Sequence, residues 1–587
     1  MKGVERKDYT MRDEYQVTKT WKYENIFWAL LISGGLFVCI YLTVPVWFET
    51  NDDTSIMNVL AGYRTGEPYP YHQFINVLLG YLVTFLYKVF PLVSWWTLLH
   101  VIFLFVSMVV IFWTSSTILK ERKFKRAYIF FYQLFIALFC FALPIQTMQF
   151  TVTSAVLGTA VIFTELLDDK KLGESKILWI FRLSGILFCF LMRRSSANVI
   201  IVLYFITFVY RYLKNGKNES NSFYLRKKIL WITITGILLL AAQFINVGVT
   251  NKIESSEFKA LNSARVHYMD RPTITYEEDP GLYNEIGWDE TFYQLTRGWY
   301  FLDERWNVLN VETIVSASEA QKSKVHIKEQ IKVVFERYYS FLMENKVGRM
   351  YFITVISFTV LSVVLFFSKK SQVKMDWIYV FLLGAVFCLL TVYLAFVGRI
   401  IRRAYQVAAI PVVIMQSFLI LQGIGIKLPK RGYLKILALL LAIGVCIPML
   451  GEVYSESRRT VYEDQSNQAN LCIDYARNNL DKILVYDTGT INNKMAWKVY
   501  QDRFPINLKS WGGSTYKSDL WNKQVAASGI EKLSAETLLE PNVYYMSADG
   551  GFRELFICYM MDKFENIDYE IVDRVNENVI ITKFYIK

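Results

Sequence analysis

Ile26-Phe-Trp-Ala-Leu-Leu-Ile-Ser-Gly-Gly-Leu-Phe-Val-Cys-Ile-Tyr-Leu-Thr-Val-Pro-Val-Trp-Phe48 is a continuous apolar segment, and Glu49-Thr-Asn-Asp-Asp-Thr-Ser55 follows it directly. A helix needs about 20 apolar residues to cross the hydrocarbon of a bilayer. The segment is too long for the core of a signal peptide, and no small-residue cleavage pattern follows it. It is therefore predicted to be an uncleaved first transmembrane helix.

Ten further apolar blocks repeat this pattern along the 587-residue chain. They lie near 95–118, 127–144, 150–167, 177–192, 197–213, 229–249, 349–367, 376–397, 404–424 and 433–451. Blocks of this length suit helices and are too long and uniform for the strands of a barrel. The sequence thus predicts an all-α polytopic membrane protein of about 11 transmembrane helices, with a core over residues 26–451.

Basic connections set the predicted orientation of these helices. The short, Lys- and Arg-rich connections are Lys120–Arg126, Asp168–Lys176, Arg211–Lys228, Ser368–Lys374 and Lys427–Lys435. The positive-inside rule places them in the cytoplasm together with the N-terminal residues 1–25. Eleven crossings keep all of these connections inside only if segment 72–90 does not cross the membrane. This segment is amphipathic and ends before Pro91, so it is expected to lie along the outer surface. The C-terminus is then expected outside, in a multi-pass protein of the cell membrane.

Three regions fall outside in this topology: loop 49–91, loop 250–348 and the tail 452–587. The tail contains strand-like runs at 483–487, 542–546 and 579–586, separated by polar helical stretches, so a small extracytoplasmic α/β domain is expected. Cys472 and Cys558 lie in this tail and would be able to pair in an oxidising compartment, which the sequence leaves open.

The net charge of +12 would suggest nucleic acid in a soluble protein. In a membrane protein, cytoplasmic basic loops account for much of that charge. We therefore expect membrane lipids and no nucleic acid as partners.

Five arginines stand where this topology disfavours positive charge. They lie in two tight outward turns between apolar helices, Arg193 and Arg194 in one and Arg399, Arg402 and Arg403 in the other. Arginines there can reach outward to lipid phosphates. Alternatively, they form a pocket that holds a phosphate or pyrophosphate by bidentate contacts, and two clusters on the same side favour this interpretation.

Acidic residues follow the first helix on the same side. Glu49, Asp52 and Asp53 are placed at the outer membrane surface. A carboxylate in a partly dry site can accept a proton from a hydroxyl, or bind a divalent cation such as Mg²⁺ or Mn²⁺. No His/Cys ligand set is visible, so carboxylates would have to hold any metal. The alternative is a solvated turn that caps the helix beginning near Ser55.

Loop 250–348 adds a second polar cluster of Arg265, His267, Asp270 and Arg271. Aromatic and charged residues alternate after it, in 276–279, 287–290 and 299–306. Rings beside carboxylates and arginines commonly hold sugars, although Trp and Tyr also anchor loops at lipid headgroups. His72 is a better candidate than His267 for contact with substrate, because it is closer to the acidic pair in sequence.

Together these features resemble the GT-C superfamily of glycosyltransferases that depend on polyprenyl-phosphate sugars. The resemblance rests on Asp52 and Asp53 after the first helix, on Gly66-Glu-Pro-Tyr-Pro-Tyr-His-Gln73 between two surface helices, on the many helices, and on the outer loop and domain. It implies transfer of a sugar from a lipid phosphate to a glycan or lipid acceptor of the cell envelope. One of the two aspartates would act as general base, and the five arginines would stabilise the departing phosphate.

Three alternatives remain. A polysaccharide polymerase or ligase of the cell envelope also uses outer arginines and a large outer loop, but it does not need the acidic pair. A transporter or flippase would be expected to show inverted repeats or matching pairs of broken helices, and none is visible. A non-catalytic anchored protein would not need eleven helices.

Overall fold

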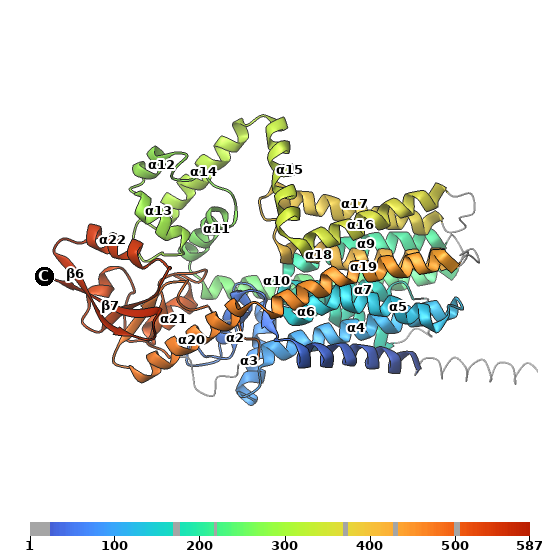
Figure 1. The fold of residues 1–587 in the computed structure, drawn as a ribbon, viewed down its shortest axis with the longest axis horizontal. Helices are drawn as coiled ribbons and strands as arrows, with labels where there is room; N and C mark the ends of the chain where they lie inside the picture. Colours follow the sequence, from blue (N-terminus) through green and yellow to red (C-terminus); the bar gives the residue numbers. More distant parts are fainter. Residues whose placement is uncertain are drawn as a thin grey trace, which may run out of the picture.

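The computed structural model describes residues 24–167, 176–215, 220–367, 374–425, 432–492, 494–497 and 505–587. A long helical bundle occupies one end of the molecule, and a smaller body of helices and strands occupies the other (Figure 1). The N-terminal residues 1–23 and most of the short basic connections lie outside the described residues, so the structure leaves the predictions for them as they are.

Every predicted apolar block falls on a helix of the bundle. In chain order these are Glu24–Thr43, α4 (Trp95–Glu121), α5 (Arg126–Ile136) continued by a π-helical turn (Ala137–Phe141) and α6 (Ala142–Gln146), α7 (Phe150–Thr164), α8 (Lys176–Met192), α9 (Arg194–Asn215), α10 (Ser220–Ile253), α16 (Lys346–Phe367), α17 (Lys374–Phe396), α18 (Arg402–Gly425) and α19 (Gly432–Ser457). Within the described part of the chain, eight helices are long and apolar enough to cross a membrane. The polytopic fold is confirmed.

Helix α7 is the centre of the bundle. All of its 15 residues are buried, which an apolar helix requires when neighbours surround it. It packs against α4, α8, α9 and α18. Its N-terminus, where Gln149 caps the first turn by accepting bonds from Thr151 N and Val152 N, lies at the end of the bundle that faces the smaller body.

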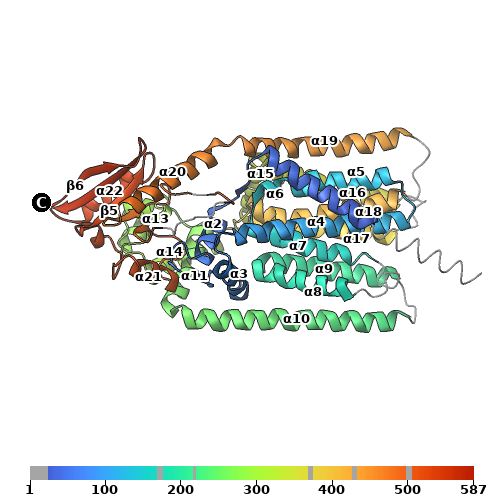
Figure 2. The same ribbon diagram turned by 90° about the horizontal axis from the view of Figure 1, so that it is seen from below.

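Short elements close that end of the bundle. Strand β1 (Trp47–Phe48) pairs in parallel with β2 (Thr147–Met148), and α2 (Asn51–Leu60) follows β1 at once. Helix α3 (Val77–Val89) runs across the axis of the bundle at the same end (Figures 1 and 2). It therefore has the placement expected of a surface helix and not of a further crossing.

The tail forms the predicted α/β domain. Its sheet has the order β4-β3-β5-β7-β6, in which β3 runs parallel to β4 and β5 while β7 is antiparallel to β5 and β6. The strands are β3 (Ile483–Tyr486), β4 (Leu508–Ser510), β5 (Val543–Ala548), β6 (Ile567–Arg574) and β7 (Val579–Ile586). The helices of the tail are α20 (Thr460–Asn478), α21 (Asp519–Ala526), a 3-10 turn (Glu536–Leu539) and α22 (Arg553–Lys563). Three of the five strands are those that the sequence predicted.

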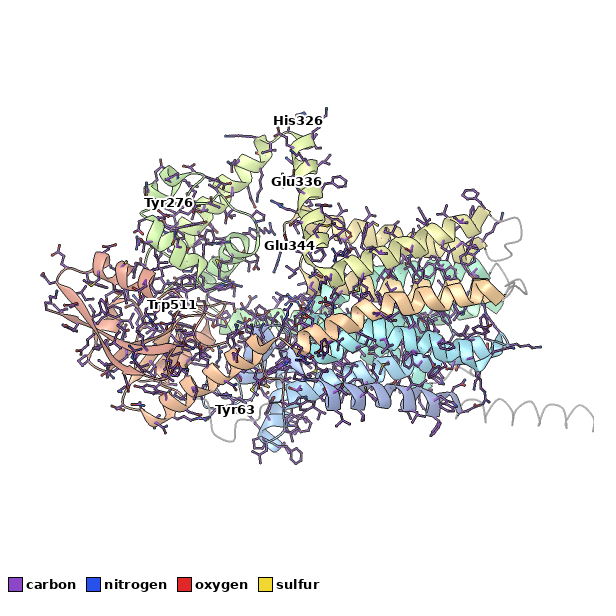
Figure 3. All side chains as sticks on the ribbon, viewed as in Figure 1. Tyr63, Tyr276, His326, Glu336, Glu344 and Trp511 are labelled. Carbon is purple, nitrogen blue, oxygen red and sulfur yellow. The ribbon has the colours of Figure 1, made fainter. Side chains whose placement is uncertain are left out.

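The loop 250–348 is helical, and it shares a hydrophobic core with the tail. Its helices are α11 (Ser256–Asp270), α12 (Pro280–Glu285), α13 (Glu290–Arg297), α14 (Val308–Lys324) and α15 (Ile327–Glu344). Trp288 and Trp306 are fully buried in one cluster with Trp511 and Tyr545 of the tail, and Trp511 lies where the two parts meet (Figure 3). These loop aromatics therefore build a core, and the expectation that they hold sugars or anchor headgroups is wrong for Trp288 and Trp306.

The two tail cysteines do not pair. Cys472 is buried in α20, against Leu484 and Met546 on one side of the sheet. Cys558 is exposed on α22, whose apolar residues belong to the core on the other side. The sheet separates the two thiols.

Candidate functional site

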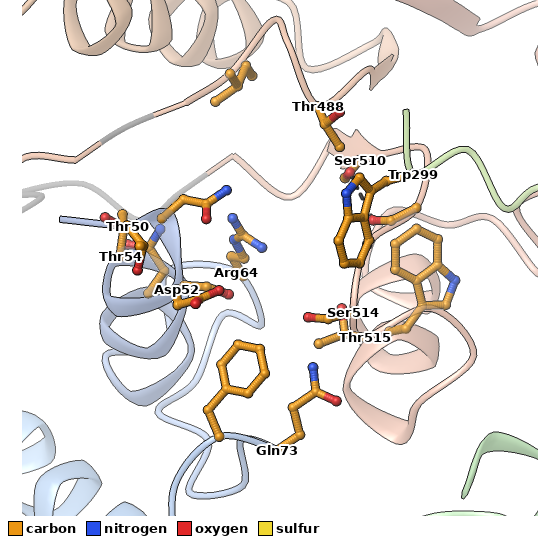
Figure 4. Close-up of a pocket in the computed structure, with 18 of the residues that line it drawn as sticks. Thr50, Asp52, Thr54, Arg64, Gln73, Trp299, Thr488, Ser510, Ser514 and Thr515 are labelled. Atoms are coloured by element: carbon orange, nitrogen blue, oxygen red, sulfur yellow. Dashed lines mark hydrogen bonds between the residues drawn. The ribbon is translucent and has the colours of Figure 1, made fainter. Parts of the chain in front are cut away.

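A cavity of about 680 Å³ lies between the end of the bundle and the smaller body. Figure 4 shows its two walls, with Asp52 and Arg64 on one and Trp299, Ser510 and Thr515 on the other. Loop 49–91, the turns before α9 and α18, helix α11 and the tail all contribute side chains. The three regions predicted to lie outside therefore meet in one place.

Helix α2 points the side chains of Asp52 and Asp53 in different directions. Asp52 and Asp53 stand in its first turn, where the helix dipole favours carboxylates. Neighbouring residues of a helix point about 100° apart. Asp52 accordingly lines the cavity with a side chain that is 27% exposed, whereas Asp53 is fully buried beneath it.

Asp53 connects α2 to the bundle. Its carboxylate accepts hydrogen bonds from Trp96 Nε1 at 3.2 Å and from Phe150 N at 3.2 Å, and it lies 3.2 Å from His100 Nε2. His100 Nδ1 is in turn 2.8 Å from Thr153 Oγ1. Burial raises the pKa of Asp53, an effect opposed by His100. With every oxygen directed into the protein, Asp53 fixes the helix that presents Asp52.

Asp52 has arginines as its neighbours. Arg403 Nη2 lies 3.8 Å from Asp52 Oδ2, and Arg193 lines the same cavity. Burial raises the pKa of Asp52, although the charges of Arg403 and Arg193 oppose the rise. The carboxylate therefore binds a proton more readily than one in water while two guanidinium groups stand beside it.

Two further arginines and an aspartate complete this group. Arg399 Nη2 pairs with Asp270 Oδ2 at 3.1 Å. Arg265 is 6% exposed; its Nη2 donates to Asn262 Oδ1 at 2.6 Å, and its guanidinium lies 5.3 Å from the ring centre of Trp299. Burial lowers the pKa of Arg265 to about 10, so it remains a cation at neutral pH.

Arg402 has another role. Its Nε donates to Glu49 Oε1 at 2.9 Å and its Nη1 to Glu456 Oε1 at 2.6 Å, with all three side chains largely buried. The structure thus places Arg402 and Glu49 in an ion cluster that joins β1, α18 and α19, outside the cavity. Arg194 is exposed at the start of α9 and also lies outside it.

The two candidate histidines, His72 and His267, and Arg271 do not line the cavity. His72 is 1% exposed, and its Nε2 lies 3.5 Å from Ser55 Oγ. Burial, aided by Arg64 and Arg193, lowers the pKa of His72 to about 3, so the ring is neutral at physiological pH. His267 is half-buried and Arg271 exposed, and neither contributes to the lining.

Several lining residues are not among the candidates predicted from the sequence. Arg64 follows α2, and Lys509, Gln524 and the loop Gly512–Thr515 belong to the tail. Trp299 also lines the cavity, with a backbone φ of 67° that non-glycine residues rarely adopt. A Gly-Gly pair after a strand-like run was the available signal for the tail residues, but their position opposite Asp52 depends on tertiary packing.

The charge of the cavity favours an anion. Six cationic side chains line it, Arg64, Arg193, Arg265, Arg399, Arg403 and Lys509, against the carboxylates of Asp52 and Asp270. Guanidinium groups hold phosphate oxygens bidentately. Within the described ranges no group of three or more His, Cys, Asp or Glu side chains is arranged to hold a metal ion.

Fold and site together define a polytopic membrane protein with a cavity rich in arginine at one end of its helical bundle. No protein-family model matches the sequence, and no curated protein matches it. Among solved structures, the chain is similar to ArnT from Cupriavidus metallidurans bound to undecaprenyl phosphate, with 10% identity, a TM-score of 0.39, and coverage of 95% of this chain and 97% of that one. A TM-score this low describes the general arrangement of the chain and carries no weight for its chemistry.

Proposed function

We propose that this protein is a membrane glycosyltransferase that moves a sugar from a polyprenyl-phosphate donor to an acceptor hydroxyl of a cell-envelope glycan or lipid. The observation that carries the proposal is the contact between Asp52 and Arg403, at 3.8 Å, in a cavity at the end of a transmembrane bundle. A base and a phosphate-binding cation must flank one anomeric carbon, and these groups are close enough to do so.

Asp52 is the proposed general base. It would accept the proton of the acceptor hydroxyl as that oxygen attacks the anomeric carbon. Its raised pKa increases its affinity for that proton. Asp53, whose oxygens face Trp96, His100 and the start of α7, is assigned to positioning Asp52.

Arg193 and Arg403 are the proposed ligands of the donor phosphate. As the bond between sugar and phosphate breaks, negative charge grows on the phosphate oxygens, and cations already in place stabilise it. Arg193 is held for this role, because its Nε donates to Ser195 Oγ at 3.1 Å and its guanidinium lies 5.0 Å from the ring centre of Phe150. Arg399 and Arg265, with Asp270, extend the cationic surface toward the acceptor.

The position of the cavity supports a lipid-linked donor. It opens where α2, the turn before α9 and the turn before α18 reach the end of the bundle. A lipid tail would enter the hydrocarbon beside the helices while its phosphate stays at their ends. On the proposed topology this end is extracytoplasmic.

The test is sugar transfer by the purified full-length protein in lipid nanodiscs, with a panel of labelled polyprenyl-phosphate sugars and envelope acceptors. Arg193→Gln and Arg194→Gln form a matched pair, since the two arginines are adjacent but only Arg193 lines the cavity. We expect Arg193→Gln to lower kcat/KM by about 100-fold, the loss typical when one charge-stabilising donor is removed, and Arg194→Gln to leave it unchanged. Equal activity of both variants with the wild type would refute the assignment.

A further inference from the structure

The C-terminal domain contributes the carboxyl ends of its parallel strands to the cavity. Strand β3 lies between β4 and β5 and runs parallel to both. The chain therefore leaves β3 toward one side of the sheet and later crosses to the other. In sheets of this kind, ligands bind beside the carboxyl ends of the strands at such a reversal. Thr488 after β3 and Ser510 at the end of β4 both line the cavity.

The loop after β4 offers several hydrogen-bond donors. Gly512, Gly513, Ser514 and Thr515 line the cavity, and their backbone N–H groups have no acceptor among the described residues. The glycines are required by the geometry. A Cβ at Gly512 would lie 1.9 Å from the carbonyl oxygen of Trp299, and Gly513 has a φ of +119°. Consecutive free N–H groups of this kind bind anions.

Two buried side chains point to the same ligand. Lys509 is 5% exposed and donates from Nζ to the backbone oxygen of Gln524. Gln524 is 9% exposed, and its Nε2 has no hydrogen-bond partner among the described residues. Both residues line the cavity. A buried amide donor without a partner is costly, and a bound acceptor group would remove that cost.

The charge around Lys509 is not balanced by the protein. Burial and the nearby Arg64 lower the pKa of Lys509 to about 7, and no described carboxylate offsets them. The carboxylates that line the cavity belong to α2 and α11 instead. This wall thus presents the Lys509 amine, an amide, hydroxyls and backbone N–H groups, all of which are hydrogen-bond donors.

We propose that Lys509, Gln524 and the loop Gly512–Thr515 form a second phosphate subsite, separate from the arginines beside Asp52. Resting on the proposed function, the phosphate it holds is either carried by the acceptor or is the second phosphate of a pyrophosphate donor. In the first case the subsite positions the acceptor, and in the second it positions the donor.

The experiment measures phosphate binding and not sugar transfer, so its result can be interpreted even if the proposed function is wrong. The full-length protein in nanodiscs is saturated with undecaprenyl phosphate, and binding of radiolabelled inorganic phosphate is followed by equilibrium dialysis. The variants are Lys509→Met and Gln524→Leu, with Lys523→Met as the control. Lys523 is a 53% exposed lysine of the same helix as Gln524, and it is paired with Asp519. In a parallel series, undecaprenyl phosphate is compared with undecaprenyl pyrophosphate.

We expect the lipid-saturated wild type to bind inorganic phosphate and both site variants to bind it at least about tenfold more weakly, as loss of a charge-assisted contact implies. Lys523→Met should match the wild type. This result assigns the subsite to an acceptor phosphate. If the wild type instead prefers the pyrophosphate lipid and Lys509→Met loses that preference, the subsite holds the donor's second phosphate. Wild-type binding of every probe by both site variants would overturn the proposal.

Discussion

Replacing each aspartate of the pair by asparagine separates catalysis from stability. Asp52 makes a partly exposed, 3.8 Å contact with Arg403, and contacts of that kind contribute about 0–1 kcal/mol to stability. Asp52→Asn should therefore fold with an almost unchanged Tm. If Asp52 is the base, the same change lowers kcat by about 10²–10⁴-fold, the range for loss of general-base catalysis.

Asp53→Asn should behave in the opposite way. The buried carboxylate accepts bonds from Trp96 Nε1 and Phe150 N, and an amide in its place directs an N–H₂ group toward one of those donors. Leaving buried groups unsatisfied costs about 1–3 kcal/mol each. We expect a clear fall in Tm, and any loss of transfer to follow from displacement of α2.

The two variants are compared by thermal unfolding in detergent and by single-turnover sugar transfer at several pH values. The reasoning is refuted if Asp52→Asn transfers sugar at the wild-type rate. It is equally refuted if Asp53→Asn has wild-type stability and lacks transfer, because Asp53 would then carry the chemistry assigned to its neighbour.

Three further predictions follow from named contacts. Arg402→Gln removes the cation that lies between the buried carboxylates of Glu49 and Glu456 and leaves Glu456 only its longer contact with Arg459. It should destabilise the protein by about 3–5 kcal/mol, and an unchanged Tm would show that the cluster is not structural. Burial alone would raise the pKa of Asp303, but hydrogen bonds from Tyr559 and Arg305 lower it to about 2. The ionised Asp303 therefore contributes about 2 kcal/mol to the free energy of unfolding. This contribution is present above the unfolded-state pKa of about 3.9 and is lost as the pH falls toward 2. Asp303→Asn should therefore lower stability at neutral pH and flatten the acid limb of the unfolding curve, and a limb of unchanged slope would contradict this. The pKa of His72 is about 3 and that of Asp52 is raised, so the rate of sugar transfer should fall with decreasing pH as Asp52 is protonated. His72→Gln should leave the midpoint of this pH profile in place, and a displaced midpoint would assign the titration to His72.

The long-range architecture could be predicted from the sequence because bilayer thickness fixes the length of an apolar helix. The same topology marked Asp52, Arg193, Arg399 and Arg403 as unusual, and all four line the cavity. Arg265 and Asp270 of the long loop join them there. The expectation that these charged residues share the outer side of the membrane was therefore enough to select them from distant parts of the chain.

Other features depend on packing that no local pattern shows. The choice between Asp52 and Asp53 depends on the rotation of α2, and Arg402 is neutralised by Glu456, 54 residues further along the chain. The aromatics of loop 250–348 look like ligands or membrane anchors until the tail supplies the other half of their core. Lys509 and Gln524 become part of the site only because the sheet turns the carboxyl ends of its parallel strands toward the bundle.

The central claim is that the cavity between the bundle and the C-terminal domain holds the donor phosphate beside Asp52. The most direct measurement is a cryo-EM structure of the full-length protein in nanodiscs with a non-hydrolysable polyprenyl-phosphate sugar. The account predicts phosphate density within hydrogen-bond distance of Arg193 or Arg403, with the sugar between that phosphate and Asp52. Donor density at any other place on the protein, with this cavity empty, would contradict it.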